Sequence, residues 1–172
     1  MYGTRKIALG GILSALVVIL LYLAAVLHTS RLFLLSLCSF AVSVVIIEGG
    51  LATGLMFYGA TSILAFLLVP DKTMPILYIS FFGIYGFAKA LIEKHITGIF
   101  QYILKFIFFN ICFFVIYLSA GLIISISMSE IKLPLPLWII ITALQTAFLF
   151  YDRVFTIVIS YYCNRFRKII IS

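Results

Sequence analysis

The stretch 137–162 carries the most regular set of polar side chains in the sequence. They recur at i, i+4, i+7, i+11, i+14 and i+18, a spacing that puts them on one face of an α-helix. The face consists of Trp138, Thr142, Gln145, Asp152 and Thr156, with the apolar Leu149 at i+11, and it holds nearly all the polar side chains of the stretch. Such a face can line a solute pocket or an ion path. Gln145, nearer the middle of the stretch, is a better pocket candidate than Asp152.

Asp152 is the acidic residue of that face. An aspartate inside an apolar helix costs on the order of 2.5–3.5 kcal/mol on membrane-insertion scales, so it should face other helices and not lipid. One interpretation is structural: Asp152 pairs with Arg153, Lys105 or Lys89 and holds the helices together. The other is an ion or proton path through Asp152, Gln145 and Lys105. The position of Asp152 near one end of the stretch favours the structural interpretation.

Two other stretches carry candidate binding residues. Asn110 lies near the middle of an apolar stretch and needs a hydrogen-bond partner, which is either a bound solute or another helix. Tyr78 begins a second aligned set that continues through Phe82, Tyr85 and Lys89, with Glu93 four residues beyond Lys89. Such aromatic rings form either pocket walls or an interfacial belt.

Signatures of catalysis and metal binding are missing from the sequence. It contains no GxSxG, HExxH, P-loop or GxGxxG motif, and no acid–base couple can be assembled by spacing. The cysteines Cys38, Cys112 and Cys163 lie within or at the end of apolar stretches, and His28 has no second ligand at metal spacing. We therefore expect neither an enzyme nor a bound metal or cofactor.

The amino-acid composition indicates the kind of environment, water or membrane, in which these residues lie. Apolar residues make up 65% of the 172-residue chain and charged residues 10%, whereas soluble domains are roughly half apolar and a quarter charged. The sequence therefore predicts a multi-pass membrane protein in contact with lipid. The net charge of +7 does not indicate a nucleic acid partner, because the basic residues are explained by the orientation of the helices in the membrane.

The fold class predicted is an all-α membrane bundle of six transmembrane helices, forming one domain over 1–172. The helices are expected at about 7–27, 32–47, 51–69, 76–92, 99–124 and 137–162. These lengths exceed what a barrel strand needs, and the stretches do not alternate polar and apolar residues. The second is short, so a re-entrant hairpin is an alternative there, and Glu48-Gly49-Gly50 predicts a tight turn after it.

The distribution of basic residues predicts the orientation. If six helices cross, one side receives Arg5, Lys6, Lys89, Lys94, Arg165, Arg167 and Lys168, and the other only Arg31, Lys72 and Lys132. The positive-inside rule then places both termini in the cytoplasm. Short polar connections at 28–31, 70–75 and 127–136 lie on the outer side.

The first helix carries small residues at helical spacing. Ala8, Gly11 and Ala15 share one face, and small residues let a second helix approach closely where lipid supplies no hydrophobic drive. The face is either a docking surface for a partner membrane subunit or an ordinary contact within the bundle. Gly50, Gly54, Gly59 and Ala60 repeat the pattern in the third helix.

These features resemble the substrate-binding S component of energy-coupling factor (ECF) vitamin transporters. The likeness is carried by residues 4–16, Thr-Arg-Lys-Ile-Ala-Leu-Gly-Gly-Ile-Leu-Ser-Ala-Leu, and by Gly49-Gly50-Leu51-Ala52-Thr53-Gly54-Leu55 before helix three. In that family a small-xxx-small element of helix one docks on a transmembrane coupling subunit. Gly11-xxx-Ala15 is the nearest match here, standing where the family has alanines.

The resemblance implies a function without catalysis by this chain. A small, vitamin-like solute would be captured from outside and carried inward after docking on a coupling subunit with ATPases, in the cell membrane of a bacterium. Tyr78, Trp138, Thr142 and Gln145, with Asn110, would contact the solute, and Ala8, Gly11 and Ala15 the coupling subunit. The alternative is a non-transporting membrane subunit or scaffold that assembles through the small-residue faces of helices one and three.

Overall fold

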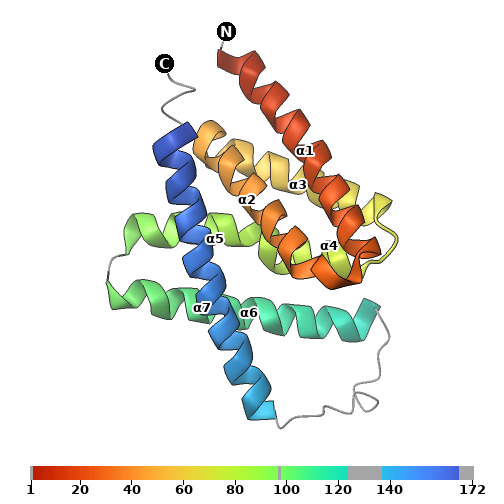
Figure 1. The fold of residues 1–172 in the computed structure, drawn as a ribbon, viewed down its shortest axis with the longest axis vertical. Coiled ribbons are helices and arrows are strands. Elements are labelled where there is room, and N and C mark those ends of the chain that lie inside the picture. Colours follow the sequence, from red (N-terminus) through yellow and green to blue (C-terminus); the bar gives the residue numbers. More distant parts are fainter. Residues whose placement is uncertain (1, 97, 124–136, 167–172) are drawn as a thin grey trace. The chain divides into compact units, whose positions relative to one another are not determined.

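The structure, a computed structural model, describes residues 2–96, 98–123 and 137–166 and contains only helices within them (Figure 1). The predicted connection at 127–136 lies outside the described residues. The helices are α1 (Tyr2–Val26), η1 (His28–Ser30), α2 (Arg31–Gly49), α3 (Leu51–Leu68), α4 (Thr73–Leu77), η2 (Tyr78–Phe82), α5 (Gly83–His95), α6 (Ile99–Ile123), α7 (Leu137–Tyr161) and η4 (Tyr162–Phe166).

Six helical stretches of the described residues are long and apolar enough to cross a membrane. Each corresponds to one of the six predicted stretches, so the all-α, multi-pass fold class is confirmed. The fourth stretch is composite: α4, η2 and α5 follow one another without a break from Thr73 to His95. The short segment η2 within it is a π-helix, which the hydrophobic period does not reveal.

The second helix is longer than the predicted range 32–47. Arg31 begins α2 and Gly49 ends it, giving 19 residues, or about 28 Å at helical rise. Arg31 can join an otherwise apolar helix because its guanidinium pairs with Asp71 at 3.3 Å. The predicted turn is confirmed: Gly50 alone separates α2 from α3, with φ of +84°, a conformation that glycine adopts without a steric penalty.

The chain divides into two compact units, with the boundary between residues 125 and 126. In the first unit, α1, α2 and α3 pack on one another and α5 packs on α2. Next to α5 lies α6, and the two form an antiparallel hairpin (Figure 1). The described part of the second unit is α7 followed by η4. The single membrane domain over 1–172 remains a prediction.

The interior of the first unit lies where α1, α2 and the fourth stretch meet. Its completely buried side chains include Val17, Leu21, Leu35, Cys38, Val42, Thr61, Met74 and Tyr78. Cys38 and Cys112 are buried free thiols, as the apolar setting of the cysteines predicted. The Cys38 thiol lies 3.8 Å from the carbonyl oxygen of Val17, which ties α2 to the inner face of α1.

Candidate functional site

The small-residue face of α1 lies on its exposed side. Ala8, Gly11 and Ala15 are all exposed, whereas Val17 and Leu21 are buried. A Cβ placed on Gly11 would have no atom within 4 Å. Gly11 therefore makes no close contact within the described part of the first unit, and docking of a partner subunit on this face remains a prediction, as does a contact within the bundle.

Two other glycines of this protein do lie at close contacts between helices. A Cβ on Gly54 of α3 would lie 2.5 Å from Cγ1 of Ile46, and a Cβ on Gly86 of α5 would lie 2.5 Å from the Ser43 hydroxyl. Both positions let α2 pack closely against a neighbour. Gly59 of α3, like Gly11, has nothing within 4 Å.

Tyr78 lies in the interior of the first unit. Its side chain is completely buried, its hydroxyl is 2.9 Å from the hydroxyl of Thr61, and its ring centroid lies 6.1 Å from that of Tyr58. A ring so enclosed does not belong to a lipid-facing belt. The phenol is engaged by α3, and contact of Tyr78 with a solute remains a prediction.

Asn110 lies on an exposed part of α6. Its side-chain nitrogen donates to the carbonyl oxygen of Phe106 at 2.8 Å, one turn earlier in the same helix. The sequence predicted a bound solute or another helix as the partner of this amide. The bond described here is made within α6, and contact of Asn110 with a solute or another helix remains a prediction.

The predicted solute residues Trp138, Thr142 and Gln145 all lie on α7, in the second unit. The continuous helix confirms that they share a face. Trp138 and Thr142 are exposed, and the Thr142 hydroxyl donates to the Trp138 carbonyl oxygen at 2.8 Å. A pocket joining them to Tyr78 and Asn110 would require both units and remains a prediction.

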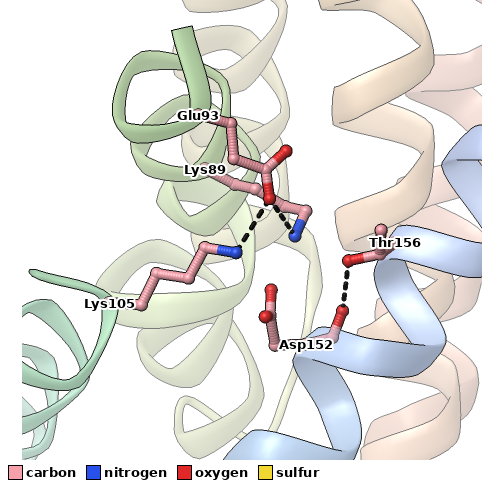
Figure 2. Close-up of polar contacts among 5 residues, drawn as sticks. All are labelled: Lys89, Glu93, Lys105, Asp152 and Thr156. Carbon is pink, nitrogen blue, oxygen red and sulfur yellow. Dashed lines mark hydrogen bonds and ion pairs between the residues drawn. The ribbon is translucent and has the colours of Figure 1, made fainter. Parts of the chain in front are cut away.

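A cluster of charged side chains links α5 to α6 in the first unit (Figure 2). Lys89 and Lys105 approach the same oxygen of Glu93, with Nζ to Oε1 distances of 2.6 Å and 2.8 Å. The two lysine side chains are buried, with 6% and 4% exposed, whereas 36% of the Glu93 side chain is exposed. The ammonium groups are thus stabilised by a carboxylate that reaches the surface.

One of the three predicted buried charges, Lys105, belongs to this cluster. Lys105 is buried, as predicted, and it pairs with Glu93, a partner not considered from the sequence. Arg153 is exposed in the described part of the second unit, and its role as a buried charge between the helices remains a prediction. Asp152 accepts the Thr156 hydroxyl at its backbone carbonyl (Figure 2). Its pairing with Lys89 or Lys105 would join the two units and remains a prediction.

The start of α2 and the loop after α3 meet at one end of the first unit. Arg31 pairs with Asp71, and Lys72 donates to the carbonyl oxygens of Phe66 and Val69 at 2.6 Å and 3.0 Å. The ammonium group therefore caps the end of α3. Two of the three predicted outer connections thus lie at the same end, as an up-and-down arrangement requires.

Two polar residues of α3 that sequence reasoning missed are the half-buried Tyr58 and the buried Thr61. The Tyr58 hydroxyl donates to the backbone carbonyl of Ile79 at 2.8 Å, and Thr61 contacts Tyr78. They lie three residues apart on one face of α3, and this helical spacing of polar residues is the sequence feature that could have identified them. Among the described residues, no group of three or more histidine, cysteine or acidic side chains is placed to hold a metal.

No protein-family model matches the chain, and no curated protein or solved structure matches it significantly. The resemblance to ECF substrate-binding components therefore depends on the sequence patterns alone.

Proposed function

We propose that this chain is the solute-capturing membrane subunit of a small-solute uptake transporter, docking through α1 on a coupling module that hydrolyses ATP. The observation that carries the proposal is the exposed face of Ala8, Gly11 and Ala15, with open space above Gly11. Close approach of a partner helix needs small residues that no other helix of the same chain already covers.

The proposal places the protein in a bacterial cell membrane and assigns the energy source to its partner. Helix one and the glycine-rich start of helix three provide the likeness to ECF substrate-binding components. The solute would be vitamin-like and small, with Trp138, Thr142 and Gln145 on α7 as its first candidate contacts. ATP hydrolysis would belong to the ATPases of the coupling module, and this chain would supply recognition and movement through the bilayer.

One observation favours the alternative of a non-transporting membrane scaffold. The polar groups of Tyr78 and Asn110 are engaged within the first unit, by Thr61 and by the Phe106 carbonyl. A scaffold needs no solute site and would associate through both small-residue faces, on α1 and on α3.

Gly11 and Gly59 both have open space at the position of a Cβ. Their substitution tests docking and distinguishes the transporter subunit from the scaffold. Among the described residues, a Cβ at Gly11 or at Gly59 has no atom of another helix within 4 Å, so the fold should tolerate leucine at either position. For the transporter subunit we expect Gly11→Leu to lower the yield of co-purified partner at least tenfold and Gly59→Leu to leave it unchanged. Loss in both variants would favour the scaffold, and retention in both would refute docking through α1. The measurement is native mass spectrometry of gently extracted protein.

Solute capture is tested in the same spectra. Wild-type protein should carry a bound small molecule, and Gln145→Leu should abolish its retention because a pocket amide is lost. Thr146→Val is the matched control, because Thr146 is the next residue, is exposed and bonds within α7 to the Thr142 carbonyl. Unchanged retention in Gln145→Leu would remove that residue from the site. Wild-type protein that carries a partner but no solute would favour the scaffold.

A further inference from the structure

The fourth membrane stretch contains a π-helical turn at its centre. The amide of Gly83 donates to the carbonyl of Tyr78, five residues earlier, whereas an α-helix bonds four residues back. A π-turn therefore holds one residue more than an α-turn, and such turns are often found at functional positions. Conversion of this turn to α-helix would shift one end of the stretch against the other by one residue, about 1.5 Å and about 100°.

A side chain of α3 contacts the π-turn directly. The Tyr58 hydroxyl donates to the carbonyl oxygen of Ile79, the residue after Tyr78 in η2. Gly83 makes this bond possible, because a Cβ there would lie 2.4 Å and 2.7 Å from two ring carbons of Tyr58. The absence of a side chain at Gly83 thus lets the ring lie on the backbone of the fourth stretch.

The two ends of the fourth stretch are held differently. At one end, α5 packs against Ser43 through Gly86 and joins α6 through Lys89 and Glu93. At the other end, α4 has five residues and packs on α1, α3 and α6, and three of its residues are buried, Met74, Pro75 and Ile76. Because α4 itself contains no charged residue, a shift of this short segment breaks packing contacts but no ion pair, whereas a shift of α5 also breaks the pairs with Glu93. Any change of register is therefore expected to move α4 and the loop at 69–72, while α5 stays in place.

We propose that η2 is a register switch, held in its π form by the bond from the Tyr58 hydroxyl to the Ile79 carbonyl. Release of this bond converts the turn to α-helix and rotates α4 relative to α5. Met74, which is 1% exposed, then leaves the interior, and the end of the first unit where Arg31 meets Asp71 opens. This device is independent of the proposed function.

Cysteine labelling at Met74 tests the switch. The reporter is Met74→Cys in full-length protein in lipid nanodiscs, with Cys163→Ser as background because Cys163 is partly exposed. Labelling by a water-soluble maleimide should be slow in this protein. It should be at least tenfold faster with Tyr58→Phe, which removes only the donor, and with Gly83→Ala, which displaces the Tyr58 ring.

Thr61→Val provides the matched control. It removes another hydroxyl contact between α3 and the fourth stretch, to the Tyr78 side chain instead of a backbone carbonyl, and should change labelling less than twofold. An equal acceleration in Thr61→Val would overturn the assignment to Tyr58, as would an unchanged rate in Tyr58→Phe. A second reporter, Val42→Cys, replaces a completely buried residue of α2 and should stay unlabelled throughout. Faster labelling of both reporters in Tyr58→Phe would mean general loosening and would also overturn the switch.

Discussion

Glu93 shows how a single carboxylate can stabilise buried cations at the edge of an apolar body. One of its oxygens receives both Lys89 and Lys105, while its own side chain reaches the surface. Burying an ammonium group is costly unless a hydrogen-bonded counter-charge is near. The cluster therefore allows lysines in helices that otherwise contain few charges, and it fixes α5 to α6.

Glu93→Gln should destabilise the protein by about 1.5–3 kcal/mol, the range for a hydrogen bond to a charged group. The amide keeps the shape and an acceptor oxygen but leaves the two lysines without this negative charge. Unfolding in a denaturant series in mild detergent measures the change. Lys94→Gln is the control: the exposed neighbour should change the free energy of unfolding by about 0.5 kcal/mol or less. Equal effects would show that the cluster contributes nothing specific.

Some glycines of the first unit are required for close packing between helices, and others are not. Gly54 lets α3 approach Ile46 of α2, whereas Gly10 on α1 faces open space. We expect Gly54→Ala to lower the free energy of unfolding by about 1–3 kcal/mol, the cost of an overpacked core. Gly10→Ala should be neutral or stabilising by up to about 1 kcal/mol, because alanine favours the helix. Thermal unfolding in detergent distinguishes them, and equal stability of the two variants would contradict the close contact.

The helices could be predicted from the sequence, but most of their side-chain contacts could not. Long apolar stretches and the Glu48-Gly49-Gly50 turn locate the helices to within a few residues, since bilayer thickness dictates their length. Lys105 and Glu93 pair although they are twelve residues apart in the sequence, and Tyr58 bonds to Ile79, which is twenty-one residues away. Such contacts follow from how the helices pack, and helical periodicity does not encode them. The π-turn was missed because it lies within an unbroken apolar stretch.

For the molecule as a whole, six crossings predict that both termini lie on the same side of the membrane. A reporter active only in the cytoplasm should therefore work when fused after Ser172, and should fail when inserted between Thr29 and Ser30 in η1. The reason is the excess of basic residues at the ends assigned to the inner side. An inactive terminal fusion together with an active reporter in η1 would reverse the orientation. Activity at both positions would contradict the number of crossings.

The single residue between α2 and α3 also has a consequence for how the protein is made. Gly50 leaves no hydrophilic segment between α2 and α3 that could keep the two helices apart while the second of them emerges from the ribosome. We expect the pair to leave the translocon together as a preformed hairpin. A nascent chain arrested just after Gly50 would still be held at the insertion machinery, and one arrested well past Leu68 would have been released into lipid.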